Sequence, residues 1–181
     1  FPQIISIVTE SRSILFIISN FSTMRFRALR FISVMPSRES LYALLPLTFT
    51  AENFGGGIGL VDSYTELNNI VLENNNIPDG DALGGGGIAI NGGITSINNC
   101  TIRNNSVGLN IYQLNGGGGI LCGFNFTETP LNLIVNNSEI YNNSANIGGG
   151  IGALSGNILL NHVLIHSNLG EYGSAISLGE P

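Results

Sequence analysis

Isoleucines that close glycine-rich stretches recur along this 181-residue sequence at a nearly regular interval. Their spacings are 30, 32, 31 and 25 residues, a period typical of proteins built from stacked structural repeats. A repeat of this length cannot bury its own apolar face, so each repeat has to pack against the repeats before and after it. The isoleucines of this column are Ile58, Ile88, Ile120, Ile151 and Ile176.

Each repeat also carries two polar pairs, and apolar and polar residues alternate on either side of them. Alternation predicts short strands whose side chains point in turn to the core and to solvent. At the first pair two residues, rather than one, separate the inward-facing positions, which predicts a tight corner in the left-handed backbone that asparagine tolerates. The first pairs are Asn68-Asn69, Asn98-Asn99, Asn136-Asn137 (after a six-residue insertion) and Asn161-His162; the second pairs are Asn74-Asn75, Asn104-Asn105, Asn142-Asn143 and Ser167-Asn168.

We therefore expect each repeat to be one turn of three strands, two corners and a variable loop. Stacked turns would lie about 4.8 Å apart, so that like residues fall above like. Side-chain amides both donate and accept hydrogen bonds, and the pairs therefore predict asparagine ladders. The glycines would let the backbones of neighbouring turns approach closely. The ladder residues are predicted to be Asn68, Asn98, Asn136 and Asn161, or their following neighbours, at one corner and Asn75, Asn105, Asn143 and Asn168 at the next.

The pattern over roughly residues 45–178 resembles the right-handed parallel β-helix, and in particular the repeats of the polymorphic outer-membrane protein family. That family carries a GGA-aliphatic motif and a Phe-x-x-Asn motif. The counterparts here are Ile-x-Asn-Asn and Gly-Gly-Gly-Ile, the latter at 55–58, 85–88, 117–120 and 148–151. Leucine or isoleucine stands in place of the aromatic residue, and glycine in place of the alanine. The resemblance implies an all-β solenoid of a kind found in secreted surface proteins.

Residues 47–181 are predicted to be the regular β-helix repeats, because the pattern is already running at Leu47. Residues 1–46 contain strand-like apolar stretches without glycine runs, so we expect degenerate turns or an N-terminal cap that covers the end of the core. The sequence is expected to be part of a longer chain.

Composition limits the classes of partner. The 43% hydrophobic content predicts a folded chain. Residues 1–38 hold five arginines and one acid, whereas residues 39–181 hold one arginine and eleven acids, so nucleic acid is not an expected partner. The apolar runs are too short to span a membrane, and no membrane span is predicted.

The repeats do not predict a catalytic site or a cofactor, because their acids are scattered rather than clustered on one face. Asp79 and Asp81 form the single close acidic pair and are the candidate calcium ligands, with a plain polar turn as the alternative. His162 and His166 are interpreted as surface substitutions. Cys100 and Cys122 both fall in inward columns but on different strands, which favours buried free thiols over a disulfide.

Six Asn-x-Ser/Thr sequons predict N-linked glycans, at Asn20, Asn99, Asn104, Asn125, Asn136 and Asn142. Asn125 lies in an insertion and is expected to be modified. Asn104 and Asn142 share a column, so both should be modified or both bare. Asn99 and Asn136 lie in adjacent corner columns, so that one can carry a glycan while the other serves a ladder.

These features lead to two hypotheses of different classes. The first is a non-enzymatic extracellular or cell-surface β-helix, structural or adhesive, glycosylated, and able to self-associate into a fibre or bind surface partner proteins. The uninterrupted repeats, the sequons and the complete absence of lysine favour it. The alternative is a carbohydrate-active β-helix enzyme, a polysaccharide lyase or hydrolase, whose site lies on turns outside this sequence. Ice binding is disfavoured because the Thr65 and Thr95 column gives way to leucine and isoleucine.

Overall fold

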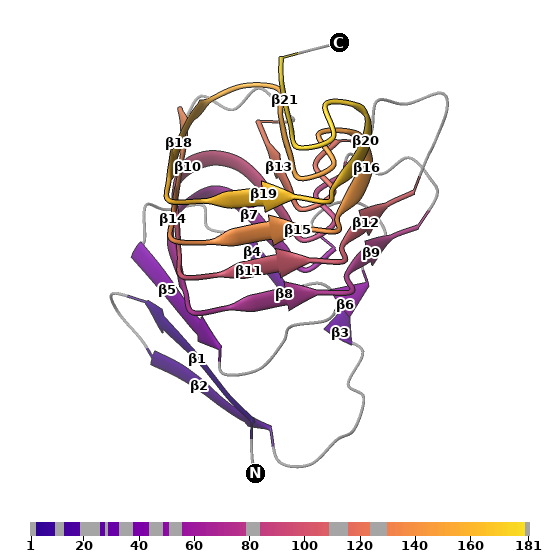
Figure 1. Cartoon of the computed structure of the whole chain (residues 1–181). Coiled ribbons are helices and arrows are strands. Elements are labelled where there is room, and N and C mark those ends of the chain that lie inside the picture. Colours follow the sequence, from indigo (N-terminus) through magenta and orange to yellow (C-terminus); the bar gives the residue numbers. More distant parts are fainter. Residues whose placement is uncertain are drawn as a thin grey trace.

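The computed structural model describes residues 3–9, 13–18, 26–27, 29–32, 38–43, 49–50, 56–78, 84–108, 116–123 and 130–179. Within these residues every regular element is a β-strand, and no helix is present. The strands form three sheets that curl around a main apolar core (Figure 1). Ile77, Val107 and Ala145 form a smaller apolar cluster of their own. The predicted all-β architecture with stacked parallel strands is confirmed.

The first sheet has eleven strands. From the N-terminal edge its main path is β2 (Ser13–Ile18), β1 (Gln3–Thr9), β5 (Arg38–Ala43), β7 (Ile58–Asn68), β10 (Ile88–Asn98), β13 (Ile120–Cys122), β17 (Ile151–Ala153) and β21 (Ile176–Leu178). Beside this path β4 (Leu29–Ile32) pairs with β7, while β14 (Leu131–Asn136) pairs with β10 and β18 (Asn157–Asn161).

The other two sheets are shorter. The second is β8 (Val71–Glu73), β11 (Thr101–Arg103), β15 (Glu139–Tyr141) and β19 (Leu164–His166). The third is β3 (Phe26–Arg27), β6 (Phe49–Thr50), β9 (Asn76–Ile77), β12 (Ser106–Val107), β16 (Ser144–Ile147) and β20 (Leu169–Tyr172).

The chain visits the three sheets in the same order in each repeat. The first turn is β7, β8 and β9, and the second is β10, β11 and β12. In the third and fourth turns the long first strand is divided, into β13 and β14 and then into β17 and β18. All strands of these turns pair in parallel, and the five predicted isoleucines lie directly above one another.

The N-terminal strands extend the first sheet in a different way. β4 and β5 pair with β7 in parallel. β1, by contrast, pairs antiparallel with both β5 and β2. The two antiparallel strands therefore lie at the N-terminal end of the stack, opposite the end that carries β18 to β21 (Figure 1).

Two corners of every complete turn use left-handed backbone, as the polar pairs predict. At the first corner, Asn69, Asn99, Asn137 and His162 have φ between 48° and 56°. At the second, Asn74, Asn104, Asn142 and Ser167 have φ between 53° and 56°. Asparagine tolerates this region better than most residues because its short polar side chain can bond locally. The corners explain why the repeats are rich in asparagine.

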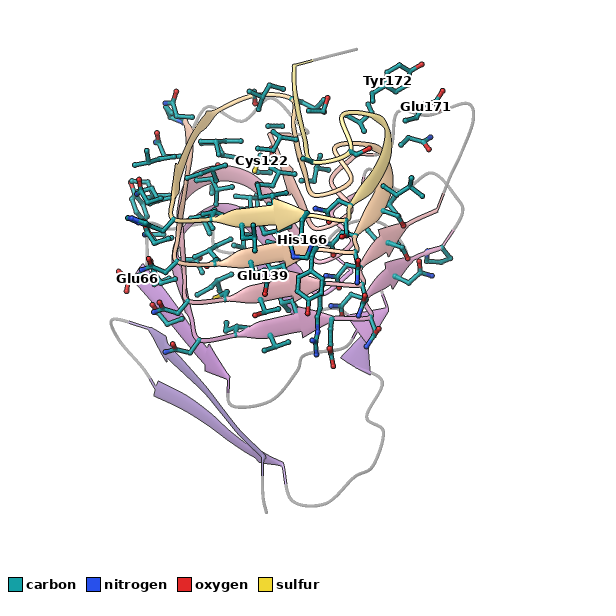
Figure 2. All side chains as sticks on the ribbon, viewed as in Figure 1. Glu66, Cys122, Glu139, His166, Glu171 and Tyr172 are labelled. Carbon is teal, nitrogen blue, oxygen red and sulfur yellow. The ribbon has the colours of Figure 1, made fainter. Side chains whose placement is uncertain are left out.

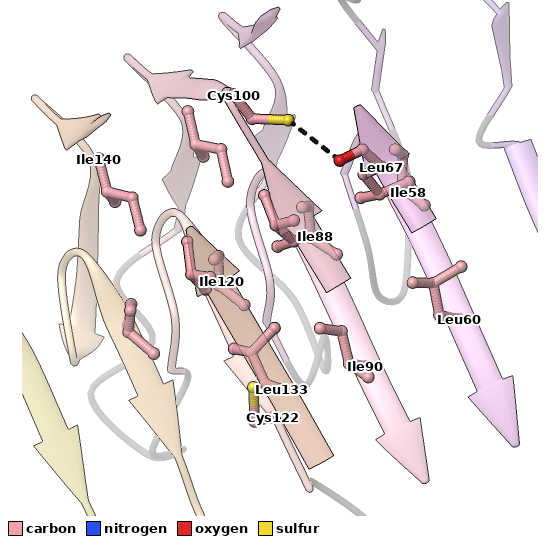
Figure 3. Close-up of a cluster of buried hydrophobic side chains, with 14 of the residues drawn as sticks. Ile58, Leu60, Leu67, Ile88, Ile90, Cys100, Ile120, Cys122, Leu133 and Ile140 are labelled. Atoms are coloured by element: carbon pink, nitrogen blue, oxygen red, sulfur yellow. Dashed lines mark hydrogen bonds between the residues drawn. The ribbon is translucent and has the colours of Figure 1, made fainter. Parts of the chain in front are cut away.

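The core consists of inward side chains stacked turn upon turn (Figure 3). Ile58, Ile88, Ile120 and Ile151 are each 0% exposed, and Cys100 and Cys122 are buried and unpaired with each other. The prediction of buried free thiols is confirmed. Cys100 Sγ lies 3.2 Å from the backbone oxygen of Asn98 and 3.5 Å from that of Leu67, which share its single thiol proton, so the thiol contacts two turns.

Glycines allow the close approach of successive turns. A Cβ on Gly87 would lie 2.6 Å from the carbonyl oxygen of Gly119, and a Cβ on Gly119 would lie 2.6 Å from that of Gly150. Real Cβ atoms do not approach backbone so closely, so this column cannot hold a side chain without displacement of the backbone.

Candidate functional site

The second corner builds a buried asparagine ladder. Asn75, Asn105 and Asn143 are at most 1% exposed, and Asn168 continues the column. Asn105 Oδ1 accepts from the backbone N–H (3.0 Å) and Nδ2 (2.8 Å) of Asn75, in the turn before it. Asn143 Oδ1 accepts in the same way from Asn105 (3.0 and 2.9 Å).

The same amides also donate backwards. Asn105 Nδ2 bonds the backbone oxygen of Leu72 (3.1 Å), Asn143 Nδ2 that of Ile102 (3.0 Å) and Asn168 Nδ2 that of Ile140 (3.0 Å). Asn105 and Asn143 therefore use both oxygen lone pairs and both amide protons, which removes the penalty of burying a polar group. The ladder acts as a specific, fully satisfied seam between turns.

The first corner builds a second ladder nearer to solvent. Asn98 Nδ2 donates to Asn68 Oδ1 (3.0 Å), Asn136 Nδ2 to Asn98 Oδ1 (2.8 Å) and Asn161 Nδ2 to Asn136 Oδ1 (2.8 Å). These side chains are half-buried or exposed, and their neighbours Asn69, Asn99, Asn137 and His162 are exposed. Of the two alternatives at this corner, the ladder forms from the first member of each pair.

A column of charged and aromatic side chains crosses the outer face of the second sheet. Arg103 contacts Glu73 through Nε (2.7 Å) and Nη2 (2.6 Å), and its Nη1 donates to Tyr141 Oη (2.8 Å). The hydrogen bond to Tyr141, followed by the bond and charge of Glu73, raises the pKa of Arg103 above its usual range. The arginine is thereby held between two neighbouring turns.

The column ends at His166, whose ring stacks on that of Tyr141 with centroids 5.0 Å apart and planes within 5°. His166 Nε2 lies 3.0 Å from Glu139 Oε1, and Figure 2 shows the two side by side on this face. The interpretation of His166 as a surface substitution did not foresee these contacts. Their signal in the sequence is the shared column of Glu73, Arg103, Tyr141 and His166, although no residue type repeats in it.

The acids with described side chains are spread over the three sheets, with Asp62 and Glu66 both on β7 and Glu73 and Glu139 both on the second sheet. Glu66 belongs to β7, Glu139 to β15 and Glu171 to β20, and Figure 2 shows them on separate sides of the molecule. Among the segments with described side chains, no three His, Cys, Asp or Glu residues gather as a metal site would require. The calcium candidates Asp79 and Asp81 lie outside the described residues.

Three of the predicted glycosylation sites point to solvent. Asn104 and Asn142 are exposed and stand above one another at the second corner, and Asn99 is exposed at the first. Asn136 instead holds the outer ladder, and the hydroxyl of its sequon residue, Ser138, is buried and donates to the backbone oxygen of Asn136 (2.8 Å). Asn20 and Asn125 lie outside the described residues.

The two cysteines are unsuited to act as nucleophiles at neutral pH. Burial raises the pKa of the Cys122 thiol to about 12, and burial also raises the pKa of Cys100. A thiol reacts as its thiolate, so both are inert in the folded chain.

Comparisons of the chain with protein-family models, with curated proteins and with solved structures find no match. The resemblance to the polymorphic outer-membrane repeats therefore stays a prediction. In the part of the chain that the structure describes, no helix is long and apolar enough to cross a membrane.

Proposed function

We propose that the chain is a right-handed parallel β-helix that acts outside the cell as a non-enzymatic structural or adhesive protein. It would carry N-linked glycans and self-associate into a fibre or bind surface partner proteins. Right-handedness follows from a general rule, since strand-to-strand connections between parallel strands of one sheet are right-handed in about 98% of cases. The connections from β7 to β10 and from β10 to β14 are of this kind.

The observation that carries the proposal is the exposed pair of sequon asparagines, Asn104 and Asn142, at the second corner. The residue that follows each of them, Asn105 or Asn143, points inward into the buried ladder. The corner therefore separates the two members of each pair, one inside and one outside. A glycan on the outer member would project into solvent without disturbing the core.

The way the polar groups are used also supports a structural role. Ladder amides and the Arg103 guanidinium bind the turns to one another. A carbohydrate-active enzyme instead needs paired carboxylates on one face, about 5–10 Å apart. Glu73 and Glu139 share the second sheet, but Glu73 is paired with Arg103 and Glu139 lies beside His166. Glu66 and Glu171 lie on the other two sheets.

Glycopeptide mass spectrometry of native material tests the proposal. We expect glycans on Asn104 and Asn142 together, on Asn99 and on Asn125, and none on Asn136. The variants Asn104→Gln and Asn142→Gln should each remove one glycan mass, whereas the matched variant Asn136→Gln should leave the mass distribution unchanged. Unmodified Asn104 and Asn142 in native protein would contradict the glycoprotein proposal, and release of sugars from polysaccharides by the purified chain would favour the enzyme.

A further inference from the structure

The second corner of the fourth turn departs from the repeat. In the three turns before it, the left-handed position of this corner holds Asn74, Asn104 and Asn142, whereas the fourth turn has Ser167 with φ 53°. Asparagine tolerates this backbone better than serine does, so serine is not the residue type that the corner favours. A side chain held in backbone that does not favour it points to a chemical role at that position.

The hydroxyl of Ser167 contacts an imidazole, which in turn contacts a carboxylate. His166 Nδ1 lies 3.1 Å from Ser167 Oγ, and His166 Nε2 lies 3.0 Å from Glu139 Oε1. Ser167 is exposed, and the side chain of His166 is 40% exposed. His166 and Glu139 lie together on the outer face of the second sheet (Figure 2). The three side chains therefore form a continuous line of contacts that is open to solvent at the hydroxyl.

The carboxylate decides which ring nitrogen of His166 carries the proton. A carboxylate only accepts hydrogen bonds, so Glu139 is bonded by an Nε2–H group. In a neutral imidazole the other nitrogen, Nδ1, is then an acceptor, and it faces the Ser167 hydroxyl. Both contacts fall in the range of about 2.6–3.2 Å in which a base takes the proton of a nucleophile and a third group orients the base.

The ring of His166 is also held from its face. It stacks on Tyr141 with ring centroids 5.0 Å apart and planes within 5°. Tyr141 Oη accepts a hydrogen bond from Arg103 Nη1 (2.8 Å), and Arg103 is in turn paired with Glu73. The stack and the carboxylate contact together restrict rotation of the imidazole, so that Nδ1 keeps facing the corner.

We propose that Ser167 is a nucleophile that takes up an acyl group from an activated ester or thioester, with His166 as its base and Glu139 as a positioning residue. The Oγ proton passes to Nδ1 while Oγ bonds to the acyl carbon. The bond from that carbon to the leaving oxygen or sulfur then breaks, and Nδ1 returns the proton to the leaving group. The products are a serine ester and a free alcohol or thiol, without any change of oxidation state. This order of hydroxyl, imidazole and carboxylate recurs as a reactive site on unrelated folds.

The exposed position of the hydroxyl limits the reaction to one acyl group per chain. Water at the corner weakens the stabilisation of a developing oxyanion. Acylation by an ester with a good leaving group tolerates this, whereas hydrolysis of the resulting serine ester has to expel an alkoxide and is much slower. The chain would therefore be labelled rather than turn over a substrate. Covalent uptake of an acyl group goes beyond the proposed structural role without making the chain an enzyme.

Acetylation of the full chain with p-nitrophenyl acetate tests the inference. We expect each chain to release one equivalent of p-nitrophenolate and to carry one acetyl group on Ser167, located by tandem mass spectrometry. Ser167→Asn restores the residue type of the other turns, so this variant should fold and lose the acetyl group. Ser174→Ala is the matched control, because Ser174 is also exposed but its hydroxyl donates to the backbone oxygen of Gly170 (3.1 Å). It should be acetylated like the wild-type chain.

Variants of the base and of the carboxylate test the roles. His166→Gln should slow acetylation of Ser167 by at least about 10-fold, less than the about 100-fold or more that a general base contributes in many enzymes. His162→Gln, at the first corner, should not slow it. Glu139→Leu gives the column the residue type that it holds one turn later, at Leu164, so the strand should stay intact. It should slow acetylation and shift the His166 ring from the Nε2–H tautomer to a mixture, seen in its nitrogen chemical shifts, which a merely structural role would not do.

A glycan on Asn142 would shield the hydroxyl, since Asn142 lies one turn from Ser167 in the same corner column. The reaction is therefore measured on the native chain and on Asn142→Gln. A Ser167 that stays unreactive in both chains, acetyl groups spread over other hydroxyls, or a rate that His166→Gln leaves unchanged would each overturn the inference. Glycan occupancy is measured separately, so the inference can fail while the proposed surface glycoprotein stands, and the reverse also holds.

Discussion

Truncation of one buried ladder amide tests how the turns are held together. Asn105→Ala removes four side-chain hydrogen bonds: the two that Oδ1 accepts from Asn75 and the two that Nδ2 donates to Asn143 and Leu72. It also leaves the buried N–H of Asn75 without its acceptor and opens a small cavity between turns. Both effects act at a residue that is 0% exposed.

The expected cost follows from these losses. A buried hydrogen bond contributes about 1 kcal/mol net, and an orphaned buried donor costs about 1–3 kcal/mol. Relaxation of the surrounding residues, or entry of a water molecule, recovers part of the lost hydrogen-bond free energy. We therefore expect Asn105→Ala to lower the free energy of unfolding by about 3–4 kcal/mol. Asn136→Ala in the outer ladder loses two bonds at a half-exposed site where water can replace them, and should cost about 1 kcal/mol.

Urea unfolding followed by circular dichroism measures both variants against the wild-type chain. The difference between them is the informative quantity, because both substitutions shorten an asparagine to alanine in a ladder. If Asn105→Ala costs no more than Asn136→Ala, or less than about 1 kcal/mol, then the buried ladder is not a specific seam and the reasoning fails.

Two further predictions concern the glycine column and the thiols. Gly119→Ala should destabilise the chain by about 2–3 kcal/mol, since its Cβ would lie 2.6 Å from the Gly150 oxygen. Gly116→Ala should cost less, because the atom nearest to its Cβ is the movable Leu121 Cδ1 at 3.3 Å. Equal urea unfolding midpoints for the two variants would contradict this prediction. Iodoacetamide at pH 8 should label neither cysteine of the native chain. Burial raises the pKa of Cys122 from 9.0 to about 12, so the thiol of the unfolded chain ionises at lower pH than that of the folded chain. The free energy of unfolding should therefore fall as pH rises from 9 toward 12. A Cys122→Ala chain with the same pH dependence would exclude Cys122 as the cause.

The stacked architecture and the positions of its corners could be predicted because the repeat acts through backbone register. Once Ile58 and Ile88 lie above one another, every later column follows by counting, and the six-residue insertion before Asn136 is absorbed before the next ladder. The left-handed corners were predictable because the doubled asparagines recur at fixed positions in this register.

Which ladder is buried could not be predicted, because both corners carry a pair of asparagines in each of the first three turns. At the first corner the left-handed residue comes second, as in Asn98-Asn99, and at the second corner it comes first, as in Asn104-Asn105. The backbone rotation, rather than the composition of the pair, decides which amide points to the core. The contacts of Arg103 with Glu73 and Tyr141 were not predicted, because the repeat was detected from residue types that recur in a column. In this column different residue types contact one another, so no type recurs.

The two ladders also divide the chain into a fixed and an adjustable part. From the outer to the inner ladder the count is seven residues in every turn, from Asn68 to Asn75 and from Asn161 to Asn168 alike. From the inner ladder to the next anchor isoleucine it ranges from 8 residues (Asn143 to Ile151) to 15 (Asn105 to Ile120). From the anchor isoleucine to the next outer ladder the count is ten residues except in the third turn, where it is 16 (Ile120 to Asn136). Insertions and deletions can therefore accumulate between the inner ladder of one turn and the outer ladder of the next while the amide seams stay in phase.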